Sequence, residues 1–131
     1  MRKIILETNV IFSALIQKNY PYLILDHCIE GNAIICVSNP LLQEYIEVLA
    51  RPKFARFADF KKNADFLIAR ISEISEFYEP INKLKIIKDE TDNRLLELAD
   101  ISKAGFIITG NTNDFTMKSF KETRIVNPRE Y

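Results

Sequence analysis

The sequence predicts an α/β fold in which a mostly parallel sheet is covered by helices on both faces, giving three layers. Short apolar runs alternate with longer segments of helical periodicity, as in repeated strand–helix units. The runs are almost continuously apolar, which is typical of strands buried on both faces. The 131 residues, 47% of them hydrophobic, suffice for one core. We therefore predict a single domain over residues 1–131.

The first elements are defined by apolar runs and glycine. Lys3–Leu6 is a predicted buried strand that ends in polar residues. Residues 21–30 are a predicted helix closed by Gly31. Residues 33–37 (AIICV) are the second predicted strand.

The middle of the chain is mostly helical. Residues 40–50 form a predicted helix with Pro40 at its first position and Asn39 as its cap. Residues 59–76 carry apolar side chains at helical spacing and predict a long amphipathic helix. A short strand is predicted over residues 77–81.

The last part returns to the strand–helix alternation. A helix is predicted over residues 91–103, a buried strand over residues 105–109 (GFIIT) and a final strand over residues 124–126. Ligands of such sheets bind outside the carboxyl ends of the strands. Functional polar residues are therefore expected at that edge.

Composition limits the possible functions. Eighteen basic residues balance eighteen acidic ones, so any nucleic-acid-binding surface must be local. Cys28 and Cys36 fit no metal-ligand spacing and are interpreted as reduced, partly buried thiols. The chain shows no targeting segment and no apolar run near the roughly 20 residues that span a bilayer, so we expect a cytoplasmic protein.

Two carboxylates follow predicted strands. Glu7 ends the first strand, and Asp114 lies a few residues beyond the GFIIT strand. Both are expected at the same edge of the sheet. The alternative for each, taken alone, is a loop acid that makes a local turn hydrogen bond.

Two further carboxylates are placed by helical phase, at about 100° per residue. Glu44 lies at the border of the apolar face of its helix, whereas Glu47 lies nearly opposite that face. Asp92 lies within about 20° of the centre of the apolar stripe of its helix. An N-terminal cap would explain Asp92, but Asp89 already precedes it as a possible cap. Asp92 is therefore more consistent with a functional role.

Carboxylates gathered without basic partners repel one another and raise each other's pKa. A divalent cation resolves this repulsion, and oxygen ligands suit Mg²⁺ or Mn²⁺. Such a site activates water for attack on a phosphodiester. The chain has one histidine, His27, which is interpreted as structural.

Several segments resemble the motifs of PIN domains, in order and at the family's spacing. The first motif, Asp-Thr-Asn-Val, is matched by Glu7-Thr8-Asn9-Val10, and the second by residues 37–45 with Glu44 as its acid. Residues 88–93 resemble the third and point to Asp92, and residues 108–115 resemble the fourth, Thr-x-Asn-x-x-Asp-Phe. Residues 47–54 are similar to the branch that contains the toxins of toxin–antitoxin pairs, and residues 128–131 resemble the family's closing motif.

The resemblance implies a three-layer α/β/α fold on a five-stranded, mostly parallel sheet. It also implies an Mg²⁺- or Mn²⁺-dependent ribonuclease that cuts single-stranded RNA, forms a homodimer and is inhibited by a small antitoxin. The implied metal ligands are Glu7, Glu44, Asp92 and Asp114. The implied residues that orient ligands or phosphate are Thr8, Asn9, Ser38, Thr109 and Asn111.

Position 7 departs from the family because Glu stands where the motif has Asp. The extra methylene displaces the carboxylate by about one carbon–carbon bond, whereas such sites need placement within roughly 0.5 Å. Three outcomes remain open: an active site with shifted geometry, a preference for Mn²⁺, or a domain that binds RNA or protein without cutting. Other α/β enzymes fit less well, since the chain has no Gly-x-Gly-x-x-Gly motif and no second acid two residues after Glu7.

Two basic groups are candidates for RNA binding. The first comprises Arg51, Lys53, Arg56, Lys61 and Lys62, interleaved with phenylalanines, and the second comprises Lys118, Lys121 and Arg124. Basic residues with aromatics can hold phosphates and stack unpaired bases. Alternatively, the phenylalanines pack into the core at a corner between helices.

Overall fold

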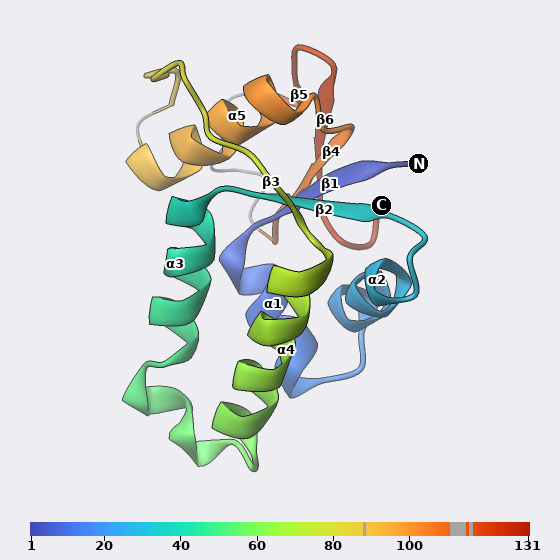
Figure 1. Ribbon diagram of the computed structural model, residues 1–131, viewed down its shortest axis with the longest axis vertical. Helices are drawn as coiled ribbons and strands as arrows, with labels where there is room; N and C mark the ends of the chain where they lie inside the picture. The colour runs from blue at the N-terminus through green and yellow to red at the C-terminus, as the bar shows by residue number, and fades with distance from the viewer. Residues whose placement is uncertain (88, 111–114, 116) are drawn as a thin grey trace.

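The computed structural model describes residues 1–87, 89–110, 115 and 117–131 (Figure 1). Its sheet has six strands in the order β3-β2-β1-β4-β6-β5. The strands are β1 (Lys3–Leu6), β2 (Ile34–Val37), β3 (Glu76–Phe77), β4 (Phe106–Ile108), β5 (Ser119–Phe120) and β6 (Thr123–Val126). Every neighbouring pair is parallel except β5 and β6. The predicted mostly parallel α/β fold is confirmed.

Five α-helices and one 3₁₀ helix lie within the described residues. They are α1 (Thr8–Ile16), α2 (Tyr20–Ile29), α3 (Asn39–Leu49), η1 (Pro52–Arg56), α4 (Phe60–Ile74) and α5 (Glu90–Ser102). Figure 1 shows α5 on one side of the sheet and α1 to α4 gathered on the other. This is the predicted three-layer arrangement.

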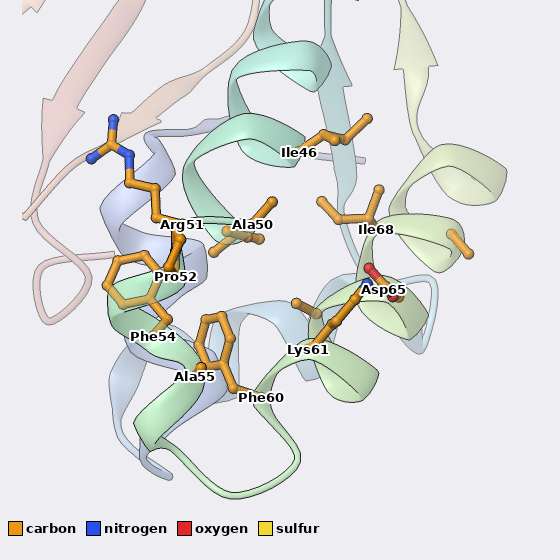
Figure 2. Close-up of a pocket in the computed structure, with 13 residues that line it drawn as sticks. Ile46, Ala50, Arg51, Pro52, Phe54, Ala55, Phe60, Lys61, Asp65 and Ile68 are labelled. Carbon is orange, nitrogen blue, oxygen red and sulfur yellow. Dashed lines mark hydrogen bonds and ion pairs between the residues drawn. The ribbon is translucent and has the colours of Figure 1, made fainter.

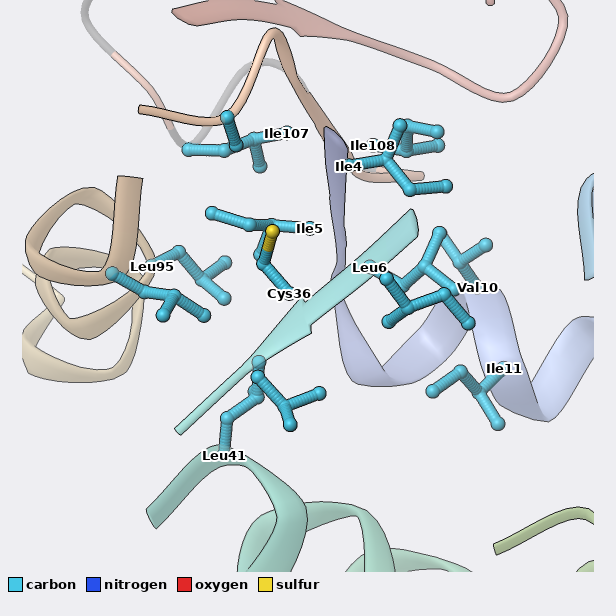
Figure 3. Packing of buried hydrophobic residues seen from close by; sticks show 14 of the residues in the cluster. Ile4, Ile5, Leu6, Val10, Ile11, Cys36, Leu41, Leu95, Ile107 and Ile108 are labelled. Carbon is cyan, nitrogen blue, oxygen red and sulfur yellow. The ribbon is translucent and has the colours of Figure 1, made fainter. Parts of the chain in front are cut away.

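The central strands explain the layers, because successive side chains of a strand point to opposite faces. Ile5 and Ile107 face the side of α5, near Leu95, whereas Leu6 and Ile108 face α1 (Figure 3). These five side chains are almost fully buried. Both faces of the sheet are therefore core, as the continuous apolar runs predicted.

Three elements were missed or misplaced. Helix α1 was not predicted, because its nearly uniform apolar sequence hides the helical period. Strand β5 makes the sheet six-stranded rather than five-stranded; it pairs with β6 across a turn at Lys121 (φ 53°), where no glycine or asparagine signals a hairpin. The strand predicted over residues 77–81 ends at Phe77, since Tyr78 makes the last ladder bond to Val37 and Pro80 has no N–H to donate.

The N-terminal caps of α3 and α5 are each provided by one side chain. Ser38, rather than the predicted Asn39, caps α3 by accepting a hydrogen bond from the N–H of Leu41 at 3.2 Å. Asp89 caps α5 by accepting from the N–H groups of Thr91 (2.8 Å) and Asp92 (3.3 Å). The cap of α5 is thus provided without the carboxylate of Asp92.

Cys28 and Cys36 are free thiols, as predicted, and both are buried. Burial raises the pKa of Cys28 to about 12 and that of Cys36 to about 11, so both stay protonated near neutral pH. In the part of the chain that the structure describes, no helix is long and apolar enough to cross a membrane.

Candidate active site

Glu7 lies where the central strand β1 passes into α1. Its N–H donates to the carbonyl of Ile108 at 3.0 Å, which places it beside the carboxyl end of β4. Its own carbonyl accepts from the N–H of Val10 at 3.0 Å and begins α1. The side chain is partly buried, and its Oε1 atom is buried with no hydrogen-bond partner among the described residues.

The surroundings of Glu7 disfavour its charge. Its pKa is raised from 4.5 to about 6, mainly because burial removes the carboxylate from water. The negative charges of Asp92 and Glu44 raise it further, and the backbone amides of Asn9 and Gly110 oppose the shift. The carboxylates of Asp92 on α5 and Glu44 on α3 therefore act on Glu7 at the end of β1.

Glu44 is held from the side of α1. The hydroxyl of Thr8 donates a hydrogen bond to Glu44 Oε2, and Thr8 is buried at the start of α1. Glu44 is partly buried and Glu47 is exposed, as the helical phase predicted. The Thr8–Glu44 bond therefore connects the residue after Glu7 to the second carboxylate.

Tyr45 also holds α3 against β1, and the sequence analysis assigned it only to the apolar stripe. The side chain is fully buried, and its hydroxyl donates to the carbonyl of Leu6 at 2.5 Å. Burial holds its pKa well above the usual value, with further contributions from the charges of Glu44 and Glu7. A signal was present, because a buried tyrosine usually needs a partner for its hydroxyl.

Asp92 is buried, with 8% of its surface exposed, in the first turn of α5. Its neighbour Asn93, which the sequence analysis also missed, is buried and binds the preceding segment. Asn93 Oδ1 accepts from the N–H groups of Ile86 (3.1 Å) and Ile87 (3.0 Å), and its Nδ2 donates to the carbonyl of Ile87 at 2.6 Å. These bonds fix the entry into α5 and hence the position of Asp92.

The remaining predicted site residues take varied positions. Thr109 is buried just beyond β4, and its N–H donates to the carbonyl of Val126 at 2.9 Å. Ser38 is buried as the cap of α3, and Asn9 is exposed on the first turn of α1. Asn111 and Asp114 lie outside the described residues.

The donor chemistry fits a hard divalent cation, because the convergent groups are carboxylates and one buried oxygen of Glu7 has no described partner. Within the described residues alone, however, no three His, Cys, Asp or Glu side chains are close enough together to hold a metal ion. The described part of the site is thus an anionic cluster rather than a complete set of ligands.

Comparison with known proteins decides the family. Residues 3–113 match the model of the PIN domain. The chain belongs to the PIN domain family. It is also 29% identical over 117 residues to an uncharacterized protein of Methanocaldococcus jannaschii, a match that covers 88% of this chain and 75% of the relative. No solved structure matches the chain.

PIN domains are generally nucleases and typically depend on divalent metals, so membership supports a phosphodiester-hydrolysing function. It also removes the alternative of another class of α/β enzyme. His27 lies in the last turn of α2, before β2 begins, so it is at the amino edge of the sheet, away from the carboxylates of this PIN domain.

In the first predicted basic group, two basic side chains pack on aromatic rings at a corner between helices. Lys53 and Arg56 lie over the rings of Phe54 and Phe57, 5.2 and 5.0 Å from the ring centroids. Both rings pack against Phe60, with centroids 5.3 and 6.0 Å away. The phenylalanines thus pack at the corner between helices, which is the alternative to base stacking that the sequence left open.

In the second basic group, one of the lysines forms an ion pair. Lys121 forms an ion pair with Asp100, which compensates part of its charge, and its role as an RNA contact stays a prediction. Sequence spacing gave no sign of this pair, whose members are far apart along the chain. Lys118 is exposed.

An apolar cavity of about 620 Å³ lies between α3, η1 and α4, as Figure 2 shows. Its walls include Ile46, Phe60 and Ile68, and Arg51 is at its rim. None of the three described carboxylates of the cluster lines it. Its lining is mainly apolar, and the carboxylate that lines it, Asp65, is paired with Lys61. The carboxyl edge of the sheet is therefore the better candidate for the chemistry of this PIN domain.

Proposed function

We propose that this PIN domain is a metal-dependent endoribonuclease that cuts single-stranded RNA. The observation that carries the proposal is that the charges of Asp92 and Glu44 act on the half-buried carboxylate of Glu7 and, together with burial, raise its pKa. The order of the four motifs along the chain supports it, and adds Asp114 as the fourth acid. The proposed cofactor is Mg²⁺ or Mn²⁺, which suits oxygen ligands.

The side chains have separate tasks in this mechanism. Glu7, Glu44, Asp92 and Asp114 would hold the cation, and Thr8 orients the carboxylate of Glu44 through its hydrogen bond. Asn9 is exposed beside Glu7 and would contact a phosphate, and Thr109 and Asn111 would support the β4 side of the site. A bound cation would lower the pKa of a water molecule and neutralise charge on the phosphodiester.

The test is cleavage of a labelled single-stranded RNA with Mn²⁺ or Mg²⁺, with EDTA as the metal-free control. Asp92→Asn should lower the rate by at least about tenfold, because it removes a ligand charge. Asp89→Asn is the matched control, since Asp89 lies on the same turn and asparagine is an equally good cap. Absence of metal-dependent cleavage, even after Glu7→Asp, would refute the nuclease proposal.

A second candidate is a domain that binds RNA or protein without cutting. It is favoured by the longer side chain at position 7 and by the lack of a three-ligand cluster within the described residues. This candidate predicts RNA binding by the parent protein and cleavage only after Glu7→Asp. Cleavage by the unaltered sequence would exclude it.

The motif resemblance further supports a cytoplasmic toxin that forms a homodimer and binds a small antitoxin. Induced expression in a bacterial host should then arrest growth, and Asp92→Asn should relieve the arrest while Asp89→Asn does not. Light scattering of the purified protein tests the dimer, whose mass should be twice the 15.2 kDa of the chain.

A further inference from the structure

A second cavity, of about 580 Å³, lies beside the carboxylate cluster. It is bounded by α5, by the segment that connects β3 to α5 and by the start of α3. Figure 1 shows the connecting segment, in olive, passing from β3 towards α5. We call this cavity the α5 groove; its polar lining includes Ser38, Lys83, Lys85, Glu90, Arg94 and Glu97.

The walls of the α5 groove are fixed by hydrogen bonds. Glu97 accepts from the N–H of Leu84 at 2.9 Å, and Asn93 binds the main chain of Ile86 and Ile87. The connecting segment is thus attached to α5 at positions one turn apart, although it is neither helix nor strand. The groove therefore keeps its shape without a ligand.

The acidic side chains of the α5 groove already have partners within its walls, whereas two of its lysines have none among the described residues. The carboxylate of Glu97 is already engaged by a backbone N–H, and Glu90 is 4.0 Å from Arg94. Lys83 and Lys85 are exposed and form no ion pair with any described residue. None of the lining residues is aromatic, so the groove suits phosphates rather than stacked bases.

The lining of the α5 groove includes residues that neighbour the carboxylates on two helices. Asn93 lines the groove and directly follows Asp92, so the two features occupy adjoining faces of the first turn of α5. Pro40 lines the groove one turn before Glu44 on α3, and residues four apart share a helix face. A strand in the groove would therefore lead directly to the proposed site of cleavage.

We propose that the α5 groove binds the sugar–phosphate backbone of the RNA strand next to the cleaved bond, with Lys83 and Lys85 as its phosphate contacts. The proposal rests on the nuclease function proposed above. It assigns substrate binding to residues outside the two basic groups that the sequence suggested. Contacts of this kind give affinity without base specificity.

The test measures binding of a fluorescent single-stranded RNA by anisotropy in EDTA, over a range of salt concentrations. The double variant Lys83→Ala/Lys85→Ala should weaken binding by about tenfold at low salt and reduce the slope of log Kd against log salt by about 1.4, or about 0.7 per lost phosphate contact. Lys83→Arg/Lys85→Arg should restore both values, since it keeps the charges.

The matched control is Arg2→Ala/Lys18→Ala, which removes the same charge from two exposed basic residues that do not line the groove. In cleavage assays the groove variant should raise KM with little change in kcat. If the parent binds and cleaves RNA but the groove variant behaves like the control, the groove proposal alone is wrong. If the parent neither binds nor cleaves RNA, the proposed function fails and the groove proposal falls with it.

Discussion

Glu7→Gln provides a test of the carboxylate cluster that does not depend on catalysis. The raised pKa of Glu7 means that the folded protein holds this proton more tightly than the unfolded chain does. The stabilisation is therefore fully present below pH 4.5 and is lost as the pH rises through about 6. Above that pH the folded protein carries a charge that its surroundings disfavour, and glutamine removes it.

The shift from 4.5 to about 6 sets the size of the effect. At about 1.4 kcal/mol per pKa unit it corresponds to about 2 kcal/mol. This net shift already includes the opposing effect of the amides of Asn9 and Gly110, which favour the carboxylate. In EDTA at pH 7.5, we expect Glu7→Gln to raise the free energy of unfolding by about 1 to 2 kcal/mol.

Urea unfolding followed by circular dichroism, at several pH values between 4 and 8, measures this difference. Glu47→Gln is the control, because that carboxylate is exposed on α3 and its replacement should change little. The advantage of Glu7→Gln should nearly vanish at pH 4.5 and reverse when Mn²⁺ is added, since ligand binding stabilises only the protein that retains the carboxylate. A variant no more stable than the parent at pH 7.5 in EDTA would refute the electrostatic argument.

Two further predictions concern the residues that hold the site together. Tyr45→Phe leaves the buried carbonyl of Leu6 without its partner and should lower the free energy of unfolding by about 1 to 3 kcal/mol, measured by urea unfolding. Tyr78→Phe, which removes a hydroxyl bonded at the protein surface, should cost less, and equal effects would contradict this reasoning. Asn93→Leu removes three hydrogen bonds to the connecting segment. It should speed hydrogen exchange at Ile87 by at least about tenfold, whereas unchanged exchange would show that other contacts hold the segment.

The sequence predicted burial best where the spacing of apolar residues along a strand or helix determines which side chains face the core. Short continuous apolar runs predicted strands buried on both faces, and β1, β2 and β4 are such strands, whereas the apolar run of α1 is a helix. Asp92 was singled out because its phase placed a charge in the apolar stripe while Asp89 was available as the cap. The structure shows Asp92 buried and Asp89 as the cap. In both cases the regular repeat of the strand or helix was enough to predict which side chains are buried.

The sequence was least informative where the partner of a side chain is set by the tertiary fold. Lys121 looked like a free cation, but folding brings it to Asp100. The hydroxyl of Tyr45 finds the carbonyl of Leu6, which lies on another element. Lys83 and Lys85 gain significance only because Asn93 and Glu97 bind their segment along α5. Contacts between residues distant in sequence leave no periodic signal, so inspection of one chain could not predict them.

The unfavourable charge of Glu7 lowers the stability of the metal-free protein and, in the proposed function, favours binding of the cation. Burial and two neighbouring charges disfavour ionised Glu7, and a cation at this position would remove that repulsion. Binding of the cation would therefore offset the free energy by which the repulsion destabilises the metal-free protein. A substitution that relieves the repulsion should raise the stability of the metal-free protein and lower its affinity for the cation. Glu7→Gln should be more stable without metal and bind Mn²⁺ more weakly. Glu7→Asp keeps the charge with a shorter reach, so its Mn²⁺ affinity measures how far the position of this carboxylate, rather than its charge, limits the site.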